Sequence, residues 1–369
     1  MTDATIPLLD LTPQTEALWD QYLAALQAVI RGGRFILGPN VQAFEQEVAA
    51  YLGVKHAIGV NSGTDALVLG LRAAGVGPGE EVLTTPFSFF ATAESISILG
   101  ARPVFVDIEA DTFNLDVSQV EVALTARTRA VVPVHLFGQA VDMAALLQLA
   151  RRYGLRVVED VAQAFGGQFR GRKLGTWGEA GCFSFFPSKP LGGMGDGGMV
   201  TTDDDGIAET VRMLRAHGAR RKYHNELVGY NSRLDELQAA ILRVKLPHVD
   251  EWTEGRRAAA AHYHELLGEV PGVVTPAECD YGTHVWHQYT VRILDGRRDA
   301  VQRALADAGI ETMIYYPLAI HQLPAYAGQY PPLPVAEQAA QEVLSLPLWP
   351  EMSPMVASQV AEVLINCLA

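Results

Sequence analysis

The sequence lacks the features of several large protein classes. Only three of its 369 residues are cysteines, and they form no CxxC pair, so neither a disulfide framework nor a zinc site is suggested. No apolar run reaches the roughly 18 residues that a membrane-spanning helix needs. The segment Met1–Pro7 lacks the basic-then-apolar build of a signal peptide. We therefore expect a cytoplasmic protein that does not contact a membrane.

Positive charge is scarce. The chain has 28 Lys and Arg residues against 42 Asp and Glu residues, and its formal net charge is -14. This balance argues against nonspecific binding to nucleic acid or to anionic membranes, so an anionic substrate would need a local basic pocket. One candidate pocket is the cluster of Arg212, Arg215, Arg220, Arg221 and Lys222, although a solvated basic turn explains the same cluster.

Common catalytic motifs are also absent, because the sequence contains no Walker A, GxSxG or HExxH pattern. The segment Gly193–Gly198 matches the letters of GxGxxG, but it follows a Lys-Pro turn and runs into the β-like segment Met199–Thr202. A dinucleotide-binding loop follows a strand and opens a helix, so we reject that interpretation. The histidines, including His262 and His264, show no helical metal spacing with a third ligand, and we expect no metal site.

Short apolar strands alternate with amphipathic helices over the first two-thirds of the chain. We predict strands at 56–60, 82–84, 103–106, 130–134 and 156–159, and helices at 64–74, 91–99 and 144–153. This α/β alternation is typical of a mostly parallel sheet between helices, in which ligands bind at the carboxyl ends of strands.

The pattern changes from about residue 250. Predicted helices at 252–267, 298–308 and near 356–365, with a strand at 287–293, indicate a smaller α+β unit. We therefore predict a large domain over residues 1–250 and a small C-terminal domain over residues 251–369.

Lys189 and Asp160 form the most informative pair. Asp160 ends an apolar strand, and Lys189 lies among serines, phenylalanines, prolines and glycines in Ser184–Gly192. A pyridoxal phosphate (PLP) enzyme requires such a pair: the lysine holds the cofactor as a Schiff base, and the carboxylate keeps the ring nitrogen protonated. A buried carboxylate at a strand end costs several kcal/mol unless it is paired. A helix N-cap is the alternative for Asp160.

The segment Asn61–Leu67, which joins a strand to a helix, is a candidate phosphate site. Gly63 allows close backbone approach, and we expect Thr64 to cap the helix, whose free N–H groups form an anion site. An ordinary N-cap is the simpler explanation for this segment alone, but a phosphate cradle suits it once Lys189 is considered. Further candidates for binding the cofactor are Phe89 as a stacking ring, Gln163 beside the ring oxygen, and Ser184 on the phosphate.

Together these motifs resemble the DegT/DnrJ/EryC1/StrS family of nucleotide-sugar aminotransferases nearly end to end. The matching segments are Gly38-Pro39, Asn61–Leu67, Ala91–Glu94, Pro133–Gln139, Glu159–Gln163, Ser184–Lys189, Asn231–Ala240 and Ser345–Pro347. The resemblance implies a fold-type-I PLP-dependent aminotransferase that works as a homodimer with shared active sites. It also implies that Lys189 shuttles the proton and that Asn231 reaches the phosphate of the partner subunit's cofactor. Family members that are dehydratases carry histidine in place of this lysine, which favours transamination here.

The resemblance also suggests a substrate. Ser184–Gly192 and His217–His224 look most like the branch that acts on UDP-2-acetamido-3-oxo-glucuronate, with L-glutamate as the amino donor, in polysaccharide or O-antigen biosynthesis. Arg233 could pair with the sugar carboxylate, and a structural ion pair with Asp235 or Glu236 is the alternative.

Other predicted substrate residues lie in two segments: the basic loop with Arg220, Arg221, Lys222 and Tyr223, which could meet the diphosphate from the neighbouring subunit, and the pair Tyr315 and Tyr316. A dTDP-3-oxo or 4-oxo-6-deoxyhexose aminotransferase is the nearest rival. A regulator that keeps the fold without catalysis is a rival from another class.

Overall fold

The computed structural model describes residues 5–369. Residues 1–4 lie outside the described part, and the predicted absence of a signal peptide rests partly on them. No helix within residues 5–369 is both long enough and apolar enough to cross a membrane.

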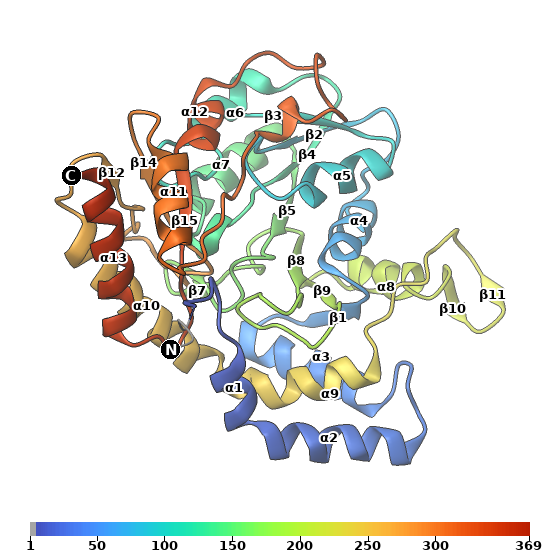
Figure 1. The fold of residues 1–369 in the computed structure, drawn as a ribbon. Helices are drawn as coiled ribbons and strands as arrows, with labels where there is room; N and C mark the ends of the chain where they lie inside the picture. Colours follow the sequence, from blue (N-terminus) through green and yellow to red (C-terminus); the bar gives the residue numbers. More distant parts are fainter. Residues whose placement is uncertain (1–4) are drawn as a thin grey trace.

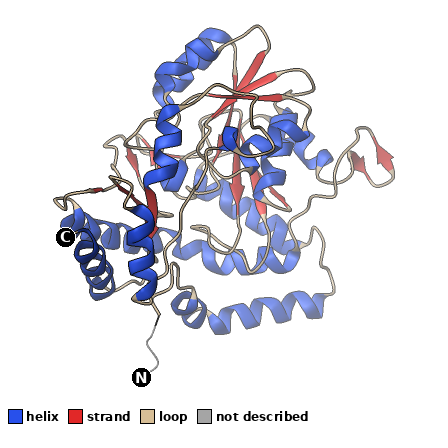
Figure 2. Ribbon diagram, turned by 45° about the horizontal axis from the view of Figure 1, so that its top comes forward, coloured by secondary structure: helices blue, strands red, loops and turns tan. Residues whose placement is uncertain are grey.

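A seven-stranded sheet forms the centre of the molecule (Figures 1 and 2). Its strand order is β1-β9-β8-β5-β4-β2-β3. Only β9 runs antiparallel to its neighbours, and the other paired strands are parallel. The strands are β1 (His56–Val60), β2 (Glu81–Thr84), β3 (Arg102–Phe105), β4 (Thr128–Val132), β5 (Arg156–Asp160), β8 (Ala180–Ser184) and β9 (Gly198–Thr202). The predicted α/β class and mostly parallel sheet are confirmed.

Both faces of this sheet are covered by helices because successive strand residues point to opposite faces and are apolar on both. Val158 of β5 and Val200 of β9 pack with one helix layer, and their neighbours Val157 and Met199 pack with the other. The first layer is α4 (Gly63–Ala73), α5 (Ala91–Ile98) and α8 (Asp205–Leu214), and the second is α3 (Pro39–Leu52), α7 (Met143–Tyr153) and α9 (Glu236–Lys245).

The connection from β8 to β9 carries Lys189 at the carboxyl end of β8. Phe185 N–H donates to the Gly197 carbonyl, and Lys189 N–H donates to the Phe186 carbonyl at 2.9 Å, so the loop folds back on itself. A Cβ at Gly192 would collide with the Pro187 carbonyl, and the turn therefore requires glycine there. The glycine-rich segment leads into a strand, in agreement with the rejection of a dinucleotide loop.

A three-stranded antiparallel sheet with its own hydrophobic core lies beside the large sheet. It consists of β12 (Val273–Val274), β14 (Tyr289–Ile293) and β15 (Val343–Leu346), packed with α10 (Val249–Leu267), α11 (Arg298–Asp307) and α13 (Pro354–Leu368). Ile6 bridges to Ile310 and joins this core, so the start of the described chain packs with its end. The domain boundary at residue 250 stays a prediction, and we propose that the N-terminal segment around Ile6 belongs to the smaller domain.

The remaining α-helices and strands are short or peripheral. They are α1 (Thr12–Ala17), α2 (Trp19–Gly32), α6 (Val117–Val120), α12 (Pro334–Glu342), β6 (Gln168–Phe169), β7 (Arg172–Lys173), β10 (Ala219–Arg221), β11 (His224–Asn225) and β13 (Gly282–Thr283). The hairpin of β10 and β11 projects away from the body of the molecule (Figure 1).

Two strands have bounds that differ from the predicted ones. The strand predicted at 130–134 stops at Val132, because Pro133 has no N–H to donate to a neighbouring strand. The strand predicted at 287–293 begins only at Tyr289, since the His287 N–H donates outside the small sheet, to the Phe137 carbonyl at 2.8 Å.

Candidate active site

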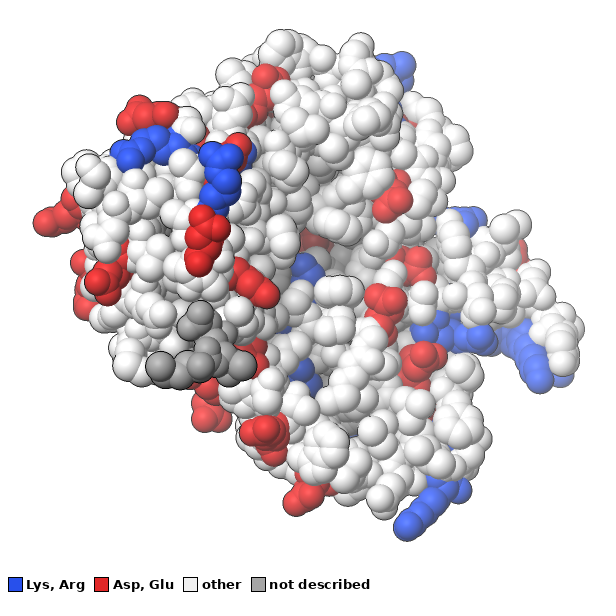
Figure 3. Space-filling view, viewed as in Figure 1, with Lys and Arg blue, Asp and Glu red and all other residues white. Residues whose placement is uncertain are grey.

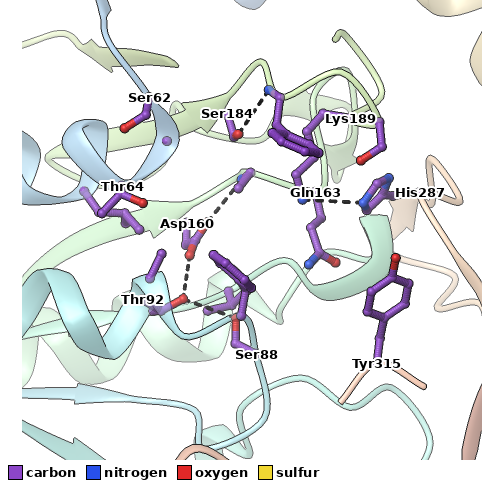
Figure 4. Close-up of a pocket in the computed structure, with 18 of the residues that line it drawn as sticks. Ser62, Thr64, Ser88, Thr92, Asp160, Gln163, Ser184, Lys189, His287 and Tyr315 are labelled. Atoms are coloured by element: carbon purple, nitrogen blue, oxygen red, sulfur yellow. Dashed lines mark hydrogen bonds between the residues drawn. The ribbon is translucent and has the colours of Figure 1, made fainter. Parts of the chain in front are cut away.

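A cavity of about 390 Å³ lies at the carboxyl ends of the central parallel strands (Figure 4). Its walls come from the segments that follow β1, β2, β5 and β8, and the segments around His287 and Tyr315 also line it. Because carboxyl ends of parallel strands meet at one edge, residues distant in sequence converge there. Nine predicted site residues line this cavity: Gly63, Thr64, Phe89, Asp160, Gln163, Ser184, Lys189, Tyr315 and Tyr316.

The Lys189 amine faces the imidazole of His287, with 3.5 Å between Nζ and Nε2. Removal from bulk water lowers the pKa of Lys189 to about 8, and the nearby Asp160 carboxylate partly opposes this change. A larger fraction of the amine is therefore uncharged near neutral pH than for a lysine in water. An uncharged amine is the form that attacks a carbonyl carbon or accepts a proton.

Asp160 is a buried carboxylate whose two oxygens are both held in place. Thr92 Oγ1 donates to Oδ2 at 2.8 Å, and Ala162 N–H donates to Oδ1 at 3.1 Å. Burial raises the pKa of Asp160, while these two bonds and the charge of Lys189 oppose the rise. No Lys, Arg or His within residues 5–369 forms an ion pair with it, so a protonated ring nitrogen fits as its cationic partner.

The helix N-terminus beside Ser184 fits a phosphate group. Helix α4 begins at Gly63, where N–H groups of the first turn have no intrahelical acceptor. A Cβ added at Gly63 would lie 2.6 Å from Ser184 Cβ, so glycine lets these two segments approach closely, as expected.

The predicted cap of this helix was wrong by two residues. Ser62, not Thr64, caps α4: its Oγ accepts from the Asp65 N–H at 3.1 Å, and its backbone is extended, with φ of −159° and ψ of 170°. The chain turns into the helix directly after Ser62, which places Thr64 in the first turn and leaves its hydroxyl at the cavity wall.

Gln163 and Tyr316 are joined on the opposite wall of the cavity. Gln163 Oε1 accepts from the Phe137 N–H at 2.8 Å, and its Nε2 donates to the Tyr316 hydroxyl at 3.0 Å. Burial raises the pKa of Tyr316, so its hydroxyl stays protonated. This pair holds the Gln163 amide in one orientation, and its place beside a ring oxygen stays a prediction.

Two of the three phenylalanines after β2, Phe87 and Phe89, have different surroundings. Phe87 is fully buried and packs against Phe113 and Tyr316, as core packing predicts. Phe89 lines the cavity with 60% of its surface exposed. An aromatic ring exposed in a cavity suits stacking on a flat cofactor, and that role for Phe89 stays a prediction.

Six predicted site residues are not among those that line the cavity: Asn231, Arg233, Arg220, Arg221, Lys222 and Tyr223. The last four belong to the projecting hairpin of β10 and β11, where basic side chains gather (Figure 3). Arg220 pairs there with Glu209 at 3.1 Å and with Glu226 at 3.6 Å. Their action on a neighbouring subunit's site stays a prediction.

Arg233 is partly exposed and forms no ion pair or hydrogen bond with any other residue from 5 to 369. The alternative of an ion pair with Glu236 does not occur, because Glu236 is buried and accepts from the N–H groups of Asn40 and Val41. These two hydrogen bonds of Glu236 cap the start of α3. The N–H donors of the Arg233 guanidinium are therefore all available for a ligand.

Among the cavity residues that sequence reasoning missed, two contact Asp160 or Lys189. Thr92 belongs to a segment quoted for the family resemblance, but its bond to Asp160 depends on how α5 packs beside β5. His287 comes from the segment before β14, and only tertiary packing brings it to Lys189. No local pattern marks either residue.

Residues 17–365 match the sequence profile of the DegT/DnrJ/EryC1/StrS aminotransferase family. The chain belongs to this family. Its relatives include the "pleiotropic regulatory protein" of Geobacillus stearothermophilus, 52% identical over 94% of both chains. The dTDP-3-amino-3,4,6-trideoxy-alpha-D-glucose transaminase of Streptomyces venezuelae is 47% identical over 94% of this chain and 92% of its own. The UDP-2-acetamido-2-deoxy-3-oxo-D-glucuronate aminotransferase of Pseudomonas aeruginosa is 44% identical over 94% of this chain and 95% of its own.

Solved structures agree with this assignment. DesV of S. venezuelae, in complex with a ketimine intermediate, superposes with a TM-score of 0.95 at 46% identity, covering 98% of both chains. NtdA of Bacillus subtilis, with bound cofactor PMP, has a TM-score of 0.89 at 32% identity, covering 95% of this chain and 81% of its own. The predicted fold-type-I architecture and the predicted cofactor, PLP, are confirmed at the level of the family.

Proposed function

We propose that this protein transfers an amino group from L-glutamate to the keto group at C3 of a nucleotide-linked sugar, with PLP as cofactor. The observation that carries the proposal is the placement of the Lys189 amine and the Asp160 carboxylate in one cavity beside the N-terminus of α4. When bound, PLP supplies an electron sink that makes the proton on the donor's α-carbon removable.

Each of the cavity side chains then has a role in the reaction. The uncharged Lys189 amine takes that proton and returns one to the sugar carbon in the second half of the reaction. The Asp160 carboxylate would pair with the protonated ring nitrogen. The first-turn N–H groups of Gly63 and Thr64, with the Ser184 hydroxyl, would hold the phosphate. The Gln163–Tyr316 pair would lie beside the ring oxygen.

Reaction at C3 is supported by the names of two relatives that differ in their nucleotide. The S. venezuelae transaminase acts on a dTDP-linked 3-amino sugar, and the P. aeruginosa aminotransferase acts on a UDP-linked 3-oxo sugar. These two relatives therefore share the position of the amino group on the sugar but not the nucleotide base. We propose reaction at C3 for either nucleotide.

The first candidate substrate is UDP-2-acetamido-2-deoxy-3-oxo-glucuronate. It is supported by the Arg233 guanidinium, which has no partner within residues 5–369 and could receive a carboxylate in two parallel hydrogen bonds. The rival is a neutral dTDP-3-oxo-6-deoxyhexose, favoured by the identity to the S. venezuelae enzyme.

We propose in addition a cytoplasmic homodimer in which Asn231 and the hairpin of β10 and β11 reach the partner's cavity. Two observations support this arrangement. The hairpin projects away from the rest of its own chain (Figure 1), and the apolar residues Leu227 and Val228, which follow β11 in the sequence, are exposed. If it is correct, dilution that separates the subunits weakens PLP binding. PLP affinity that does not change with protein concentration across dissociation would contradict it.

Turnover in the reverse direction tests the activity. The PLP-loaded protein is incubated with 2-oxoglutarate and either a UDP-linked 3-amino uronate or a dTDP-linked 3-amino-6-deoxyhexose, and L-glutamate is measured. Glutamate formed from either sugar, and not by Lys189→Ala, supports the proposal. A protein that binds PLP but forms no glutamate from any 3-amino sugar would favour the regulator instead.

A further inference from the structure

The loop between β8 and β9 is rich in glycine, and the proposed function does not explain this composition. Five of the seven residues from Gly192 to Gly198 are glycines, which give the backbone more freedom than any other residue. The same loop carries Lys189 to the cavity wall (Figure 4), and its Asp196 also lines the cavity. Lys189 therefore keeps one position only if contacts from outside the loop restrain the glycine-rich part.

Gln238, in the first turn of α9, supplies such a contact through both ends of its side-chain amide. Its Oε1 accepts from the Met194 N–H at 2.8 Å, and its Nε2 donates to the Met194 carbonyl at 3.1 Å. The two bonds fix the orientation of the amide, because an NH2 group cannot accept from a backbone N–H. The amide thus pairs with both backbone groups of one residue, as a neighbouring antiparallel strand would.

The glycines on either side of Met194 leave room for the Gln238 side chain. A Cβ at Gly195 would lie 2.8 Å from Gln238 Nε2, and a Cβ at Gly193 would lie 2.8 Å from Gln238 Oε1. Chain neighbours aside, the three atoms nearest to that Cβ position at Gly195 all belong to Gln238. These two glycines of the GxGxxG letters therefore accommodate a glutamine side chain of the same protein.

The start of α9, from which Gln238 extends, is itself fixed by packing. Glu236 is buried, and its carboxylate accepts from the N–H groups that begin α3. Leu234 is also buried, and a Cβ at Gly197 would lie 3.0 Å from Leu234 Cδ1. The segment before and at the start of α9 therefore contacts α3 on one side and the glycine-rich loop on the other, which makes it a rigid support for the loop.

We propose that Gln238 is a positioning residue: by binding the backbone of Met194, it holds the loop that carries Lys189 and thereby keeps the amine at the cavity wall. As far as PLP is concerned, this inference rests on the part of the proposed function that makes Lys189 the residue that holds the cofactor. The two hydrogen bonds belong to the protein without cofactor and are testable there.

Hydrogen–deuterium exchange in the cofactor-free protein measures the state of the loop. Gln238→Ala removes both hydrogen bonds, so the Met194 amide should exchange about fivefold to thirtyfold faster than in the wild type. Gln238→Met keeps a side chain of similar length without either polar atom, and it should give the same increase. It also replaces Gln238→Ala in the test if the alanine variant does not fold.

Gly195→Ala tests the same contact from the side of the loop. Its Cβ should displace the Gln238 side chain, so the Met194 amide should exchange as fast as in Gln238→Ala. The double variant should exchange no faster than either single variant, because the same two hydrogen bonds can be lost only once. Gly77→Ala is the control, since a Cβ there would meet nothing within 4 Å.

The rate of PLP release separates positioning from a merely structural contact. After dilution of the PLP-loaded protein, the absorbance band of lysine-bound PLP should decay about fivefold to tenfold faster in Gln238→Ala and in Gly195→Ala than in the wild type. Unaltered exchange at Met194, effects that simply add in the double variant, or faster exchange with an unaltered rate of PLP release would each overturn the proposal. A protein that holds PLP but transfers no amino group would contradict the proposed function and leave both measurements as expected, so the two failures can be told apart.

Discussion

Replacing Lys189 by methionine should make the cofactor-free protein more stable at neutral pH. The folded protein holds the pKa of Lys189 at about 8, against 10.5 for a lysine in water. That difference corresponds to about 3 kcal/mol of folding free energy, which the wild type loses when it buries an amine that is charged in the unfolded chain. The side chain keeps some contact with water in the cavity, and we therefore expect a gain of about 2 kcal/mol for the variant at pH 7.

The gain should depend on pH in a defined direction. Between pH about 8 and 10.5 the unfolded chain binds more protons at Lys189 than the folded chain, so the wild type gains stability as pH rises. The advantage of Lys189→Met should therefore shrink to below about 1 kcal/mol at pH 10. Urea unfolding of the cofactor-free wild type and of Lys189→Met at pH 7 and pH 10 measures the difference in their free energies of unfolding.

Two other lysines provide controls. Burial also lowers the pKa of Lys245 to about 8, and this residue is only 6% exposed but does not line the cavity. Lys245→Met should show a similar pH-dependent gain and keep PLP binding. Lys222→Met changes an exposed lysine and should leave the stability unchanged. A Lys189→Met variant that is no more stable at pH 7, or whose advantage is the same at pH 10, would refute the reasoning.

Three further predictions follow from the cavity. Gly63→Ala places a Cβ 2.6 Å from Ser184 Cβ, and overpacking of this kind should cost about 1–3 kcal/mol of stability and weaken PLP binding in a titration. Adding Ser184→Gly should restore the stability, and Gly32→Ala, whose Cβ meets nothing within 4 Å, is the control. The rate at which the cofactor-free protein captures PLP should rise with pH and level off above the Lys189 pKa of about 8; a rise that continues past pH 10 would contradict the lowered pKa. Arg233→Ala should reduce kcat/KM about tenfold to a hundredfold on a uronate and have little effect on a neutral 6-deoxyhexose; equal losses on both would exclude the carboxylate role.

The part of the site that follows the sheet strands was predictable from the sequence. Gly63, Asp160 and Ser184 each come at or after the end of an apolar strand, and parallel strands bring such positions to one edge. The helix cap was misplaced because Ser62 and Thr64 are both good caps. Which one acts depends on where the backbone leaves the extended conformation, and local composition does not fix that residue.

Features that depend on tertiary packing were not predictable in the same way. His287 comes from the smaller unit, and its approach to Lys189 follows from how that unit packs against the large sheet. Strand β15 was missed because Val343–Leu346 continues directly from helix α12, and a short apolar run of this kind suits either element. The role proposed for the projecting hairpin depends on a second subunit.

The measurement that tests the central claim most directly is the visible absorbance of the PLP-loaded protein as a 3-amino sugar nucleotide is added. The account predicts that the band of lysine-bound PLP is lost and that pyridoxamine phosphate forms. 2-Oxoglutarate added afterwards should take up the amino group as L-glutamate and restore the band. Lys189→Ala should show neither the starting band nor the conversion. A PLP-loaded protein whose band is unaltered by every UDP- and dTDP-linked 3-amino sugar, or a band that Lys189→Ala retains, would contradict it.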